Sequence, residues 1–177
     1  MHACFVNAAF GRCPAMYGRK LHPLTLGHCL ILDHLDNVAL YLPKPSNNAL
    51  VVAAWICSQP WHEAQSKIMR GIYAHDIQVW GHLARKTKYG TELKKWRQYR
   101  ETYFRFPDRW IDEKETKSRS KCAPWQYRIA AALMKLGISE ERTWNMALPL
   151  AFSYFVADCE NNGDNDFVND SERRAGA

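Results

Sequence analysis

The chain has 177 residues, of which 47% are hydrophobic and 12% aromatic, so it has enough apolar surface for one packed core and is not an intrinsically disordered protein. Its longest apolar run, Ala49–Cys57, is far shorter than the roughly 20 residues that a membrane-spanning helix needs, and we expect no contact with a membrane. The formal net charge of +6 is unevenly spread, because residues 85–121 hold 13 Lys and Arg against 6 Asp and Glu, whereas residues 158–172 hold 6 acids and no base.

The N-terminal residues 1–19 show no regular periodicity, and no basic segment precedes their short apolar stretch. We therefore expect an irregular lead-in rather than an export signal. The six cysteines are widely spaced, with no CxxC pair among them. That spacing favours buried free thiols and a reducing cytoplasmic location over a disulfide framework.

From residue 20 onward, apolar residues recur at the spacing of helices. A first helix is predicted to begin at residues 23–25 and to end near Asp36. Ser46 is a favourable N-cap for a second helix over residues 47–58, which is apolar nearly all round and should lie centrally. A third, long helix is predicted to start at Pro60 and run to Lys86.

The next helix is predicted to begin at Thr91, which is a suitable capping residue, and to end at Phe106, just before a proline. The polar residues 112–122 are then the best candidate for a loop, and they would divide the domain into two helical halves.

Three further helices are predicted in the second half. Pro124 is suited to the first turn of one that Gly137 stops. Ser139 caps the next, and Pro149 should break it near the start of the last helix, which runs from about Leu148 to Gly163.

These patterns together predict an all-α fold, a single domain of five to seven helices over residues 20–163. Its N-terminus is irregular, and its acidic C-terminus, residues 164–177, is a frayed and flexible tail. We see no strong strand signal and no internal repeat.

Sequence motifs of catalysis are absent. The chain contains no GxSxG, phosphate-binding loop, GxGxxG or HExxH pattern, and its histidines and cysteines do not have metal-ligand spacing. We therefore expect a protein that is not an enzyme, with no catalytic residues, no metal and no cofactor.

The basic stretch of residues 85–121 interleaves cations with aromatic residues, which is a composition suited to holding phosphates and stacking on bases. A surface for docking another protein uses the same residue types. The candidate nucleic-acid-binding residues are Lys94, Lys95, Trp96, Arg97, Arg100 and Tyr103.

Two parts of the chain carry a family resemblance. The first is the stretch Leu21–His28 leading into an apolar helix, with Ala54–Pro60 opening another. The second is Pro124–Trp125 followed by Leu136–Ala151, closing on the acidic Glu160–Asp164. Their order resembles small helical proteins of tailed phages and prophages, in particular the tail assembly chaperone type.

The resemblance implies a non-enzymatic protein in the cytoplasm of a bacterial host cell. Such proteins bind the long, apolar, helical tape-measure protein and keep it soluble while the tail assembles, which requires a groove that accepts a helix. An exposed groove of this kind would also favour self-association. The candidate protein-binding residues are Trp125, Ile129, Leu133, Trp144, Leu148, Phe152 and Phe155. The alternatives are a nucleic-acid-binding protein that uses residues 85–121 and a structural virion component.

Overall fold

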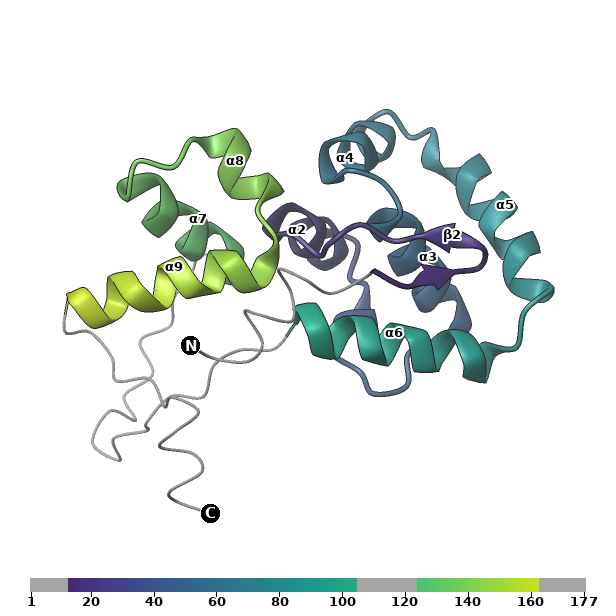
Figure 1. The fold of residues 1–177 in the computed structure, drawn as a ribbon. Coiled ribbons are helices and arrows are strands. Elements are labelled where there is room, and N and C mark those ends of the chain that lie inside the picture. The colour runs from purple at the N-terminus through teal and green to yellow at the C-terminus, as the bar shows by residue number, and fades with distance from the viewer. Residues whose placement is uncertain (1–12, 105–123, 163–177) are drawn as a thin grey trace, which may run out of the picture.

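The computed structural model describes residues 13–104 and 124–162 (Figure 1). In chain order the elements are β1 (Ala15–Met16), β2 (Arg19–Lys20), α2 (Leu26–His34), the 3-10 helix η1 (Val38–Leu40), α3 (Asn47–Cys57), α4 (Trp61–Met69), α5 (Tyr73–Arg85), α6 (Tyr89–Tyr103), α7 (Trp125–Lys135), α8 (Glu140–Asn145) and α9 (Leu148–Asn161). The all-α prediction is confirmed, with eight α-helices in the described residues instead of five to seven. The predicted loop 112–122 and the tail 164–177 lie outside these residues.

Part of the expected lead-in, residues 1–19, proves to be ordered. β1 and β2 form an antiparallel hairpin around Tyr17 and Gly18, which have positive φ angles of 49° and 79°. Two consecutive positive φ angles characterise the tight turn that suits the natural twist of a hairpin. Met16 is fully buried and Tyr17 nearly so. The prediction was wrong for residues 13–19 because strands of two residues are too short to produce a visible alternation.

The predicted third helix from Pro60 to Lys86 is also wrong, since the structure divides it into α4 and α5. Gly71 has a φ of +68°, and its N–H donates to the carbonyl of Ile68 at 2.9 Å. The next N–H, that of Ile72, reaches back to Lys67 at 3.1 Å. This is a Schellman ending, which glycine allows without steric cost.

Most other helix ends follow the predicted local chemistry. The hydroxyls of Ser46 and Ser139 accept hydrogen bonds from the first turns of α3 and α8. Gly137, with a φ of +83°, ends α7, and Pro149 is the second residue of α9. Thr91 does not cap α6, because that helix already begins at Tyr89, two residues earlier than predicted.

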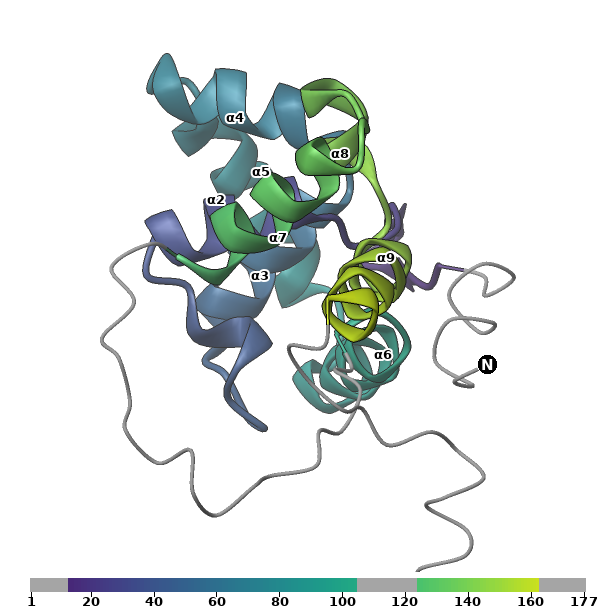
Figure 2. The same cartoon turned by 90° about the vertical axis from the view of Figure 1, so that its left-hand side faces the viewer.

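Helix α2 lies between the two halves of the described structure, the N-terminal half (residues 13–104) and the C-terminal half (residues 124–162) (Figure 1). It contacts α3 and α4 on one side and α7 and α8 on the other. The N–H of Leu148 donates to the carbonyl of Leu24 at 2.7 Å, joining the start of α9 to the residues before α2. In the view turned by 90°, α7, α8 and α9 lie in front of α2 and α3 (Figure 2).

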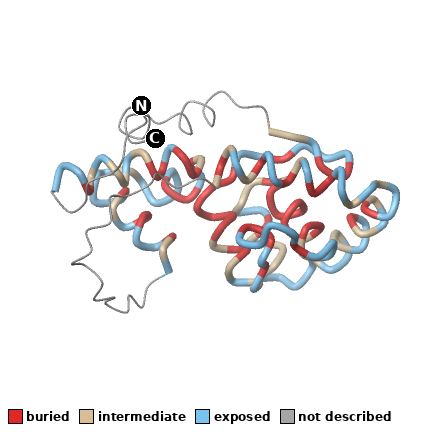
Figure 3. Tube along the Cα trace, turned by 90° about the horizontal axis from the view of Figure 1, so that it is seen from below, coloured by how far each residue is buried: buried red, intermediate tan, exposed pale blue. Residues whose placement is uncertain are grey.

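Buried side chains from both halves belong to one continuous hydrophobic cluster. The backbone view from below shows buried stretches turned toward the interior and exposed stretches on the outer faces (Figure 3). None of the helices in the described part of the chain has the length and apolar character that crossing a bilayer requires.

Candidate functional site

The seven residues predicted to form a groove for a partner helix lie inside the C-terminal half. Five of them are buried, namely Ile129, Leu133, Trp144, Leu148 and Phe152, and the other two, Trp125 and Phe155, are half-buried. The ring of Trp125 stacks on that of Phe152 with centroids 5.9 Å apart. These side chains therefore hold α7, α8 and α9 together, and they do not form an open groove. The spacing of these residues in the sequence correctly indicated apolar helix faces, but it did not show that the faces pack against the core.

The aromatic residues of the predicted nucleic-acid site are also buried. Trp96 is fully buried, and its indole N–H donates to the carbonyl of Ala39 at 2.9 Å. Tyr103 is 1% exposed, with its hydroxyl 3.1 Å from the Cys13 sulfur. Neither ring can stack on a base, so that part of the prediction is wrong.

Two arginines of the same stretch attach α6 to the segment after α2. The Arg97 guanidinium donates twice to the carbonyl of Pro43, at 3.1 and 2.9 Å. Arg100 donates through Nη1 to the carbonyls of Leu40 at 3.2 Å and Leu42 at 2.8 Å. The backbone of residues 40–43 is thereby fixed against the C-terminal part of α6.

The two lysines among the six predicted residues differ in their surroundings. Lys95 pairs with Glu92 at 2.8 Å, and the other carboxylate oxygen of Glu92 accepts the N–H of Tyr17 at 3.0 Å. Lys94 is exposed. The structure thus does not gather the six predicted residues into one binding surface.

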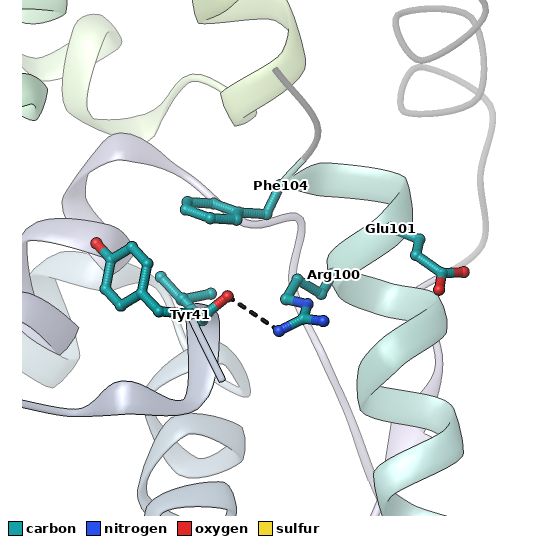
Figure 4. A pocket seen from close by; sticks show the side chains of 5 residues that line it. Tyr41, Arg100, Glu101 and Phe104 are labelled. Atoms are coloured by element: carbon teal, nitrogen blue, oxygen red, sulfur yellow. Dashed lines mark hydrogen bonds between the residues drawn. The ribbon is translucent and has the colours of Figure 1, made fainter. Parts of the chain in front are cut away.

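An open pocket of ≈ 560 Å³ lies where α6 meets the segment after α2, lined by Leu40, Tyr41, Arg100, Glu101 and Phe104. Figure 4 shows the Arg100 guanidinium reaching from α6 toward the backbone that carries Tyr41, whereas the Glu101 carboxylate points away. The rings of Tyr41 and Phe104 meet edge to face with centroids 5.7 Å apart.

In the segment that supplies one wall of this pocket, three large apolar side chains are exposed within five residues of sequence, Val38, Tyr41 and Leu42, at 42%, 49% and 45%. The Tyr41 hydroxyl donates to Asp33 at 2.6 Å, and the fully buried Gln126 donates to the other oxygen of that carboxylate. Burial and the bond to Asp33 raise the pKa of Tyr41 well above its ordinary value. The ring is therefore held in place as a neutral phenol next to the pocket.

The buried His28 of α2 has a structural role, because it links two segments by hydrogen bonds. Nδ1 of His28 accepts the N–H of Thr25 at 3.2 Å, and Nε2 lies 2.9 Å from the carbonyl of Gln59, to which it donates in the neutral tautomer. Burial lowers the pKa of His28 to about 4. The ring stays neutral and joins the start of α2 to the residue before Pro60.

The four cysteines among the described residues are free thiols, of which Cys29, Cys57 and Cys159 are buried, as predicted, whereas Cys13 is half-buried. Burial raises the pKa of Cys57 to about 12 and that of Cys29 well above its ordinary value, so neither forms a reactive thiolate. Within residues 13–104 and 124–162, no three His, Cys, Asp or Glu side chains are arranged to hold a metal ion.

The pocket was missed in the sequence because its two walls come from positions 60 residues apart. The available signal was a short apolar run that ends at Leu42, where the following proline prevents an α-helix from continuing. Comparisons of the chain with models of protein families, with curated proteins and with solved structures find no match.

Proposed function

We propose that this chain is a non-enzymatic protein-binding domain, and that it binds an apolar helix of a partner protein at the pocket between α6 and residues 38–42. The observation that carries the proposal is the grouping of exposed Tyr41 with the Phe104 ring and the Arg100 guanidinium around one open pocket, with exposed Leu42 next to Tyr41 in the chain. Aromatic residues and arginine are enriched where protein interfaces concentrate their binding energy.

Two features support a preformed site. The Tyr41 ring is fixed by its bond to Asp33, and the backbone of Leu40 and Leu42 is fixed by Arg100. A surface that is already ordered loses less conformational entropy when a partner binds. An apolar side chain of a partner helix would enter the pocket, with its neighbours against Val38 and Leu42.

The specific role we propose is that of the tail assembly chaperones which the chain resembles, shielding the apolar tape-measure protein in the cytoplasm of a bacterial host. The resemblance of the stretches at Leu21–His28 and Leu136–Ala151 supports this role. The proposed surface differs from the residues first predicted, because those on α7, α8 and α9 are in the core.

The test is a pull-down of the tagged chain from its native host at about 0.15 M salt after nuclease treatment. Wild type should retain a long helical protein, and the double variant Tyr41→Ser/Leu42→Ser should lose it. Tyr127→Ser/Leu136→Ser is the matched control, because those side chains are 49% and 47% exposed on and just after α7 and do not line the pocket. It should bind as wild type does.

Thermal unfolding of each variant must first show that the fold is intact. Retention of the helical protein by the Tyr41→Ser/Leu42→Ser variant would refute the proposed site. Recovery of nothing but further copies of the chain would refute the chaperone role and favour a structural virion component.

A further inference from the structure

A second surface, separate from the pocket, is strongly positive. Exposed cations come from the hairpin and from the end of α5 with the link that follows. We call this surface the basic corner and define it as Arg19, Lys20, Arg85, Lys86 and Lys88. The basic stretch recognised in the sequence, residues 85–121, did not include Arg19 and Lys20.

These residues are brought together through Tyr17 in the hairpin turn. Its ring lies edge to face against Trp80 of α5, with centroids 6.1 Å apart. Its N–H donates to Glu92 of α6 at 3.0 Å. Figure 1 shows the hairpin tip beside α5, with α6 running below it. Arg19 is thus two residues after Tyr17, which contacts both α5 and α6.

The acidic side chains nearby do not neutralise this charge. Glu92 is 2% exposed, and its two oxygens are taken by Tyr17 and Lys95. Asp76, at the start of α5, binds Lys67 at 2.8 Å. The exposed Glu101 is nine residues beyond Glu92 on α6, which places it about 13 Å further along the axis.

We propose that the basic corner binds nucleic acid through the phosphate backbone, without reading the bases. Three of its five residues are lysines, which serve phosphates as point charges but are depleted from protein interfaces. Stacking on bases is not expected, because the aromatic side chains of α6 that face the core, Trp96, Tyr99 and Tyr103, are at most 1% exposed. This inference does not depend on the proposed protein-binding function.

The test is fluorescence anisotropy with the full chain and a labelled DNA duplex of random sequence, between about 50 and 200 mM salt. Each phosphate that a cation neutralises contributes about −0.9 to the slope of log K against log salt. The variant Arg85→Gln/Lys86→Gln/Lys88→Gln should therefore reduce the magnitude of the slope by about 2 to 3 and weaken binding at every salt concentration. A duplex of different sequence should bind equally well.

The matched control is Arg128→Gln/Lys135→Gln/Arg142→Gln, which removes three exposed cations from the C-terminal half and the same net charge. It should bind the duplex as wild type does, and so should the pocket variant Tyr41→Ser/Leu42→Ser. Equal losses in the two charge variants would show a general effect of net charge and overturn the proposal. Binding to polyglutamate but not to DNA would overturn it in favour of an acidic protein partner.

Discussion

At the scale of single residues, the polar side chains inside this protein act as connectors between distant segments. His28 joins residue 25 to residue 59, and Glu92 joins α6 to the hairpin. A buried polar group that loses its partner costs about 1–3 kcal/mol, so each of these bonds constrains the arrangement of elements. Burial also affects ionisation, because it lowers the pKa of His28.

His28 provides a prediction about pH. Burial lowers its pKa in the folded protein to about 4, from an ordinary value of 6.5. Below pH 6.5 the unfolded chain takes up a proton that the folded chain does not, so the stabilising contribution present above pH 6.5 is lost as the pH falls toward 4. The free energy of unfolding should fall by about 3 kcal/mol over that range from this residue alone.

The measurement is urea unfolding of wild type and of His28→Gln at pH values from 7 to 4. Glutamine is neutral throughout, so the stability advantage of wild type over the variant should shrink as the pH falls. Parallel curves for the two proteins would show that His28 is already charged in the folded state or is not buried.

At the scale of elements, α4 approaches α2 closely at a glycine. A Cβ on Gly27 of α2 would lie 2.5 Å from Cγ and 2.8 Å from Cε3 of the Trp61 ring. Only glycine permits that distance, and Trp61 in turn packs against Trp144 of α8, with centroids 6.1 Å apart. The position of α4 therefore depends on one missing methyl group in α2.

Replacing Gly27 with alanine should destabilise the protein by about 1–3 kcal/mol, because the added methyl group overpacks the contact with Trp61. The control is Gly81→Ala in α5, where a Cβ meets no atom within 4 Å. There the better helix propensity of alanine should stabilise by roughly 0.5–1 kcal/mol. Urea unfolding measures both changes, and a stabilising Gly27→Ala substitution would contradict the close approach.

At the scale of the whole molecule, α2 is shared by the two halves of the described structure. It contributes buried residues to one continuous core that also contains residues of α3 and of α7 to α9. The bond from Leu148 to Leu24 and the pairing of Thr25 with Ala147 add backbone links between the halves. Neither half can lose its structure without exposing apolar residues of the other.

We therefore predict one cooperative unfolding transition. Far-UV circular dichroism and tryptophan fluorescence should give the same midpoint in urea. The buried Trp144 of α8 lies in the C-terminal half, and Trp144→Ala should lower stability by about 3–5 kcal/mol while keeping the two midpoints together. Two separate midpoints, with only one of them moved by the substitution, would show that the halves unfold independently.

The sequence by itself determined most of the helices and where many of them end. Ser46, Gly137 and Ser139 act through bonds to their own first or last turn, so their effect can be recognised without knowing the rest of the fold. The apolar character of residues 47–58 likewise predicted a central helix, and seven of the eleven residues of α3 are buried. Gly71 acts equally locally, but its signal was outweighed by apolar residues that continue on both sides.

Tertiary structure alone decided which aromatic faces point inward and where a binding surface remains. The faces of Trp96 and of the α7–α9 residues could equally have met a partner, because an apolar helix stripe is the same whether a core or another protein covers it. The pocket and the basic corner each combine residues far apart in the chain, such as Leu40 with Arg100 and Arg19 with Lys88. Their formation depends on how helices pack around α2, and helix packing is set by contacts between distant residues that no local pattern records.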